Sequence, residues 1–146
     1  MLDAAGYPGM KILEFAFDGD STNGYLPHNY RTSNSVCYTG THDNETLPGW
    51  VKSSDKKTID FCKKYLGVKK DSDISWAMVR LCWSSICDTA IAQMQDLLEL
   101  DSTARMNTPS TVGNNWKWRL DSMDTLTDKL SDKLSELTLL YNRVNS

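Results

Sequence analysis

The chain has 146 residues, of which 40% are hydrophobic and 24% charged, and this suffices for one domain with a buried core. The net charge is −3 and the Lys and Arg residues are scattered, which argues against a nucleic-acid-binding protein. No apolar run approaches the roughly 20 residues of a membrane span and no signal peptide is visible, so we expect a cytoplasmic protein without a membrane partner.

The first predicted elements are strands. Residues 11–17 form a mostly apolar run with one charge near its middle, and they predict a buried strand. A polar loop follows over residues 18–29. Residues 35–39 predict a second short strand, which runs directly into the polar sequence Gly-Thr-His-Asp-Asn at 40–44. A strand followed by a polar loop and then a helix is typical of a βα unit.

Helices and a weaker strand follow in alternation. Apolar residues at helical spacing predict a helix over residues 55–66, ended by Gly67. A second helix is predicted over residues 74–86, with Asp73 as its N-cap. Residues 89–93 are short and ambiguous, but a third strand there fits the alternation.

The last segment contains a loop and a helix. Breaker residues indicate a loop over residues 101–115, and leucines at steps of three and four predict an amphipathic helix over residues 127–143. The elements together predict an α/β fold with parallel strand pairing. Three strands make a poor doubly covered sheet, so we expect the chain to be part of a larger fold. Because the first and third strands would then lack a neighbour on one side, we expect a marginal or oligomer-dependent fold.

The candidate site is His42-Asp43, immediately after the second predicted strand. Ligands and catalytic groups collect at the carboxyl ends of parallel strands. A carboxylate accepts hydrogen bonds from neighbouring hydroxyls and stabilises developing positive charge, and a neutral imidazole donates to a further hydroxyl. These roles suit a sugar. The competing interpretation, which spacing alone favours, is that Asp43 caps the next helix and His42 is an ordinary loop histidine.

Two further segments carry polar or aromatic side chains of interest. Trp116-Lys117-Trp118-Arg119 has the residues to stack on sugar rings or to close one end of a barrel, and we expect one of the two tryptophans in the core. Asn107 is a candidate polar ligand group. The four cysteines form no CxxC pair and only two histidines are present, so we expect no metal, no cofactor and reduced thiols.

Several motifs together resemble those of the 4-α-glucanotransferases, also called amylomaltases or disproportionating enzymes. The similar segments, in the family's order, are residues 8–17, 23–29, 36–46, 95–98, 105–109 and 115–119. The resemblance implies the last three βα units of a (β/α)8 TIM barrel, incomplete as it stands. Residues 1–146 would be the C-terminal part of a glycoside-hydrolase-type catalytic domain, with no separate second domain.

The resemblance also implies a function and roles for individual residues. The family transfers an α-1,4-glucan segment with retention, using an Asp nucleophile and a Glu acid/base. Asp43 matches a third carboxylate that supports the transition state, and His42 matches its sugar-binding neighbour. The other two carboxylates are expected upstream of Met1, so we expect the chain to be inactive alone. Its expected partners are maltooligosaccharides and the missing N-terminal part. The alternative is a non-catalytic glucan-binding or complementing fragment.

Overall fold

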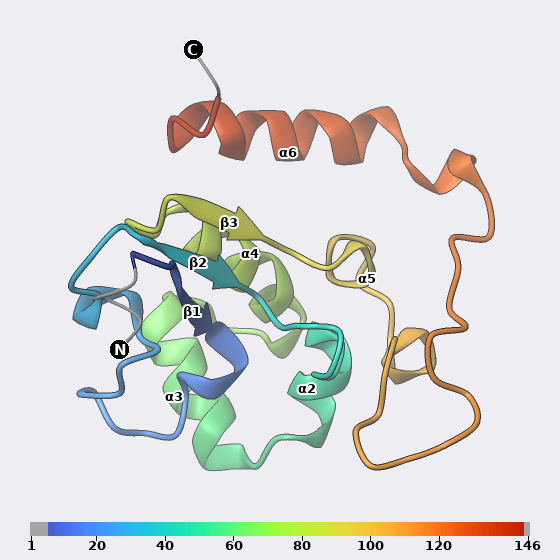
Figure 1. The fold of residues 1–146 in the computed structure, drawn as a ribbon, viewed down its shortest axis with the longest axis horizontal. Helices are drawn as coiled ribbons and strands as arrows, with labels where there is room; N and C mark the ends of the chain where they lie inside the picture. Colours follow the sequence, from blue (N-terminus) through green and yellow to red (C-terminus); the bar gives the residue numbers. More distant parts are fainter. Residues whose placement is uncertain (1–5, 145–146) are drawn as a thin grey trace.

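The computed structural model of the protein describes residues 6–144. One parallel sheet runs in the order β1-β2-β3, with β1 (Gly9–Ile12), β2 (Ser35–Tyr38) and β3 (Thr89–Ile91). The α-helices are α2 (Leu47–Ser53), α3 (Lys56–Leu66), α4 (Ile74–Trp83), α5 (Met94–Leu97) and α6 (Asp128–Leu140). The predicted α/β fold with parallel pairing is therefore confirmed (Figure 1).

Helices cover one face of the sheet. Lys11, Cys37 and Ala90 stand in register and so point to the same face. Cys37 is fully buried there, and the Cys82 thiol of α4 donates to its carbonyl oxygen at 3.2 Å. On the opposite face Met10 is 55% exposed and Ile91 is 41% exposed. Among the described residues this second face of the sheet is thus largely uncovered.

The first predicted strand, over residues 11–17, is confirmed only for residues 11 and 12 and is wrong for the rest. β1 ends at Ile12, and a 3-10 turn over Leu13–Phe15 follows, closed by a bond from the Ala16 amide to the Leu13 carbonyl at 2.9 Å. The turn places Leu13 and Phe17 in the core, where both are at most 1% exposed. A continuous apolar run is compatible with either structure, so its hydrophobic pattern did not distinguish a strand from a turn.

Helix α2 was not predicted, whereas α3 was. Thr46 caps α2 by accepting a hydrogen bond from the Gly49 amide at 3.2 Å, and Pro48 lies in the first turn, where no donor is lost. The predicted helix over 55–66 is confirmed as α3. Asp55 is its N-cap, with the Thr58 amide donating at 2.8 Å, and Gly67 ends it at φ 72°.

Helices α4 and α6 end about three residues earlier than predicted. α4 stops at Trp83, and the Asp73 side chain makes no capping hydrogen bond. α6 stops at Leu140, and the chain then turns so that Arg143 donates to the carbonyls of Trp83, Ser85 and Cys87 at 2.6–3.0 Å. This arginine fixes α6 beside the turn between α4 and β3 (Figure 1).

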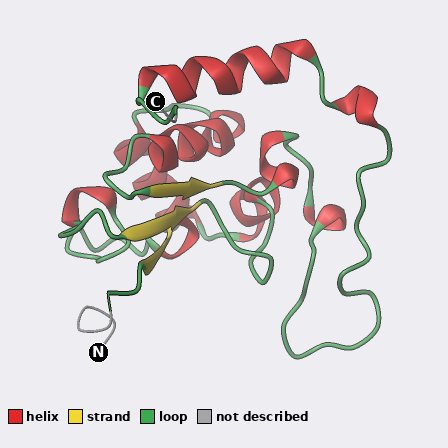
Figure 2. Cartoon of the chain, turned by 45° about the horizontal axis from the view of Figure 1, so that its top comes forward, coloured by secondary structure: helices red, strands yellow, loops and turns green. Residues whose placement is uncertain are grey.

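A long loop separates α5 from α6. Figure 2 shows residues 105–122 extending away from the sheet before the chain returns to α6. The predicted loop over 101–115 is interrupted only by a short 3-10 turn at Ser102–Ala104. No helix within residues 6–144 has the length and apolar character needed to cross a lipid bilayer.

Candidate functional site

The structure brings together the three site residues predicted from the sequence. His42 and Asp43 follow β2, and Asn107 lies in the loop after α5. The Asn107 side-chain amide donates to Asp43 Oδ1 at 2.5 Å, and His42 Nε2 lies 3.3 Å from the same oxygen. The Asn107 backbone amide also donates to the His42 carbonyl at 3.1 Å. Both His42 and Asp43 side chains are about half exposed, at 54% and 50%, so a ligand can reach them.

Asp43 does not cap the next helix. Thr46 takes that role for α2. Within the loop, Asn44 Oδ1 accepts hydrogen bonds from the Thr41 amide at 2.9 Å and from the Thr41 hydroxyl at 2.7 Å. These bonds hold the turn without using the Asp43 carboxylate. The helix-capping interpretation of Asp43 is therefore wrong.

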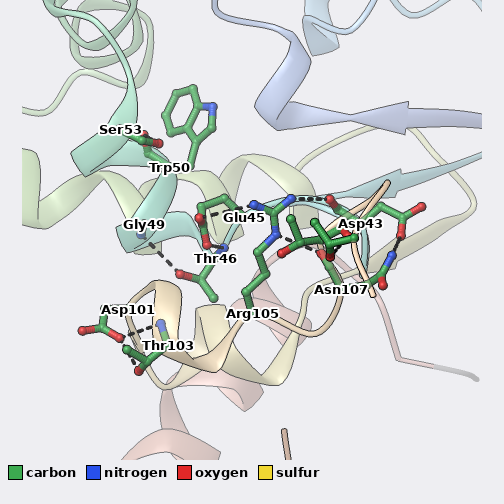
Figure 3. A network of polar contacts seen from close by, with 12 residues as sticks. Asp43, Glu45, Thr46, Gly49, Trp50, Ser53, Asp101, Thr103, Arg105 and Asn107 are labelled. Carbon is green, nitrogen blue, oxygen red and sulfur yellow. Dashed lines mark hydrogen bonds and ion pairs between the residues drawn. The ribbon is translucent and has the colours of Figure 1, made fainter. Parts of the chain in front are cut away.

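Arg105 lies at the centre of the polar network around the site (Figure 3). Its Nη2 donates to the Asp43 carbonyl at 2.8 Å and its Nε to the Asn107 carbonyl at 2.9 Å. Its Nη1 lies 3.5 Å from Glu45 Oε2 in an ion pair. Sequence reasoning gave this arginine no role, because two of its three partners, Asp43 and Glu45, lie about 60 residues away in the sequence.

Trp116 forms an aromatic wall beside His42. The two ring centroids are 4.8 Å apart with an interplanar angle of 43°, and Trp116 is 54% exposed. Its backbone has φ 64°, and its amide donates to the Met106 carbonyl at 2.7 Å. Trp118 is half-buried, and neither tryptophan joins the core cluster. The expectation that one of them is a core residue is therefore wrong.

Asp96 anchors both ends of the loop that carries His42 and Asp43. Its carboxylate is fully buried and accepts hydrogen bonds from the Thr39 hydroxyl at 2.7 Å and the Leu47 amide at 2.8 Å. Thr39 precedes the loop and Leu47 begins α2. Burial raises the pKa of Asp96, and these two donors act in the opposite direction by favouring the charged form. The anchor ties α5 to β2 and α2.

Glu14 lies buried beneath the same loop. It is 8% exposed, and its Oε1 has no hydrogen-bond partner among the described residues. Burial, then the charges of Asp96 and Glu45, raise the pKa of Glu14 to about 9, so its carboxyl is neutral at pH 7. A Cβ on residue 40 would overlap Glu14 Oε1, which explains why the loop begins with Gly40. Sequence reasoning saw only one charge within an apolar run.

The exposed groups suit a neutral polyhydroxylated ligand. A carboxylate that accepts hydroxyl hydrogen bonds, an imidazole, an amide and an aromatic face meet at one rim, formed by Asp43, His42, Asn107 and Trp116. Among residues 6–144, no group of three or more His, Cys, Asp or Glu side chains is arranged to hold a metal ion. Hydroxyl recognition beside a carboxylate is the chemistry that these residues support.

Comparisons with known proteins give one family. The family model described as 4-alpha-glucanotransferase matches residues 1–126. A 4-alpha-glucanotransferase of Clostridium butyricum is 45% identical over 139 residues, covering 94% of this chain and 28% of its own length. A chloroplastic/amyloplastic 4-alpha-glucanotransferase of Arabidopsis thaliana is 46% identical over 142 residues, covering 95% of this chain and 24% of its own.

The solved structures agree with the sequence comparisons. The structure of the amylomaltase from Streptococcus agalactiae in complex with acarbose superimposes with a TM-score of 0.92 and 39% identity. The match covers 99% of this chain but 29% of the amylomaltase. The chain therefore spans less than a third of the length of the relatives that it matches.

Proposed function

Because the chain belongs to the 4-alpha-glucanotransferase family, we propose that it supplies one wall of the active site of a glucan-transferring (β/α)8 barrel. Three parallel strands in sequential order, with helices on one face and the other face uncovered, suit three consecutive βα units of such a barrel. Residues 1–146 would then be the C-terminal part of the catalytic domain.

A cytoplasmic location remains a prediction, supported by four cysteines that are all unpaired thiols.

The meeting of Asp43, His42 and Asn107 carries this proposal. Asp43 would stabilise the oxocarbenium-like transition state, while His42 and Asn107 would bind sugar hydroxyls. The similar amylomaltase was solved with acarbose, which supports α-1,4-glucans or maltooligosaccharides as the ligands here.

We infer that the described residues do not make up the full catalytic set. A retaining mechanism needs a nucleophile and an acid/base whose carboxyl groups lie about 5–5.5 Å apart across the scissile bond. Glu45 is paired with Arg105, and both Glu14 and Asp96 are buried. None of these three is placed to attack a sugar. We therefore assign both missing roles to residues outside this chain and expect the chain to be inactive alone.

A glucan-binding or complementing fragment remains the second candidate. It is favoured because all three sugar-facing polar residues of the site, His42, Asp43 and Asn107, come from this chain. On this alternative the chain binds a maltooligosaccharide without turning it over, and it completes an active site only when the remaining barrel strands are added.

Asp43→Asn tests both the site and the inactivity. The 146-residue chain should show no maltotriose disproportionation, and by titration calorimetry it should bind acarbose weakly. Losing a hydrogen bond to a charged group costs about 1.5–3 kcal/mol, so Asp43→Asn should weaken binding roughly 10- to 100-fold. Asp132→Asn, on the exposed face of α6, is the matched control.

Two results would contradict the proposal. Turnover of maltotriose by the chain alone, lost in Asp43→Asn, would show that the catalytic set is complete. Absence of binding heat at millimolar acarbose would count against a glucan site built from these residues alone.

A further inference from the structure

We propose that Arg105 is the positioning residue of this site, which sets the spacing between Asp43 and Asn107 while Glu45 neutralises its charge. The inference rests on the proposed function, because it explains how the glucan-facing groups are held. Each of three guanidinium nitrogens has a different partner, namely the Asp43 carbonyl, the Asn107 carbonyl and the Glu45 carboxylate. A planar guanidinium fixes such directions rigidly, whereas a lysine ammonium does not.

One of the two carbonyl bonds joins segments that are far apart in sequence, and the other is local. Asp43 lies 62 residues before Arg105, in the loop after β2. Asn107 lies two residues after Arg105, so the Nε bond closes a local turn. Arg105 therefore holds the backbone carbonyls of Asp43 and Asn107, while the side chains of the same two residues are hydrogen-bonded to each other (Figure 3).

Arg105 forms its ion pair with Glu45 and not with the Asp43 carboxylate. Glu45 is 19% exposed at its side chain, and its Oε1 accepts a hydrogen bond from the Thr46 amide at 3.0 Å, which fixes the carboxylate. The Asp43 carboxylate instead has the neutral amide of Asn107 and the imidazole of His42 as its neighbours, and no Arg or Lys side chain forms an ion pair with it among the described residues. An arginine paired with the Asp43 carboxylate would weaken the stabilisation of positive charge that develops on the sugar.

Neither of the two buried acids, Glu14 and Asp96, forms a hydrogen bond or ion pair with Arg105 among the described residues, although the Arg105 charge slightly offsets the raised pKa of Glu14. Glu14 is neutral at pH 7, and Asp96 is held by the Thr39 hydroxyl and the Leu47 amide. Arg105 and Glu45 thus form one ion pair next to the exposed Asp43 carboxylate.

Arg105→Lys keeps the positive charge but loses the planar guanidinium with its three separately bonded nitrogens. The variant therefore distinguishes a positioning role from an effect of the charge alone. We expect acarbose affinity to fall at least 10-fold by titration calorimetry in Arg105→Lys and further in Arg105→Ala. In nuclear magnetic resonance spectra the side-chain amide of Asn107 should move towards its solvent-exposed shifts in both variants. The His42 ring signals, shifted by the Trp116 face, should move as well, while those of His28 stay fixed.

Arg80→Lys, on the outer face of α4, is the matched control and should change neither readout. Urea unfolding midpoints show whether Arg105→Lys remains folded, and Glu45→Gln provides a second variant that leaves Arg105 in place. In Glu45→Gln we expect reduced affinity, because the uncompensated guanidinium then competes for the Asp43 carboxylate.

Unchanged Asn107 and His42 signals in folded Arg105→Lys would overturn the inference whether or not the chain binds acarbose. If the native chain binds no acarbose but these signals move as expected, the glucan proposal fails and the positioning role stands. Native affinity in Arg105→Lys would overturn the positioning role and leave the glucan proposal intact.

Discussion

Replacing Glu14 with glutamine should raise the free energy of unfolding at pH 8 by about 2–4 kcal/mol and change it little at pH 5. In the folded chain the Glu14 carboxyl has its pKa raised from 4.5 to about 9, chiefly by burial. The native state therefore holds a proton that the unfolded chain releases above pH 4.5. Glutamine has the same shape and is neutral at every pH, so it removes this penalty.

The direction of the pH dependence follows from proton counting. Between pH 4.5 and about 9 the native state binds more protons than the unfolded state at Glu14, so stability falls as pH rises through this window. The fall amounts to at most about 1.4 kcal/mol per pH unit, and water reaching the carboxyl in the folded state lowers it.

Urea unfolding at pH 5, 6.5 and 8 measures the effect. Glu136→Gln, at an exposed position of α6, is the matched control, and its free energy of unfolding should change with pH as that of the native chain does. If the free energy of unfolding of Glu14→Gln shows the same pH dependence as that of the native chain, Glu14 is ionised in the folded protein. The assignment of a neutral, buried carboxyl beneath the loop is then wrong.

Asp96→Ala should lower the free energy of unfolding by about 3–5 kcal/mol. The change leaves two buried donors without an acceptor, the Thr39 hydroxyl and the Leu47 amide, and each unsatisfied donor costs about 1–3 kcal/mol. Because these donors stand at both ends of the 40–46 loop, the loop should also lose its fixed position. The His42 ring signals should broaden or shift accordingly.

Asp96→Asn is the informative companion variant. Its amide oxygen still accepts one of the two hydrogen bonds, while its NH2 group opposes the other donor, so the loss should fall between the native chain and Asp96→Ala. Urea unfolding at pH 7 gives the order. A loss below about 0.5 kcal/mol in Asp96→Ala would show that water replaces the carboxylate and that the anchor is dispensable.

The sequence predicted those parts of the fold whose signals are local. Helix α3 carries its own start and stop, because Asp55 caps one end and Gly67 adopts the left-handed conformation at the other. Helix α2 was not predicted, and its Pro48-Gly49 dipeptide is of a kind that is typical of turns. In the structure, Thr46 supplies the cap, and a Cβ on Gly49 would lie 2.5 Å from the Ser102 hydroxyl oxygen, so close packing requires glycine.

The candidate site divides in the same way. His42 and Asp43 were predictable because they end a strand at the edge where parallel sheets place their ligands. Asp96, Glu14 and, for its bond to Asp43, Arg105 act through partners that are distant in the sequence, and no pattern of spacing reports such contacts. The isolated charge of Glu14 within an apolar run was the one available signal, since a buried carboxylic acid needs an explanation.

Trp116 holds a bulky side chain on a left-handed backbone, which costs roughly 1 kcal/mol or more. Glycine would relieve that strain, but it would remove the ring that faces His42. The Trp116 ring beside His42 is therefore kept at a cost in stability, in a loop outside the sheet. At this position stability favours glycine, whereas contact with a ligand favours tryptophan. Changes in the length or composition of this loop can alter ligand preference while the strands and helices beneath it stay as they are.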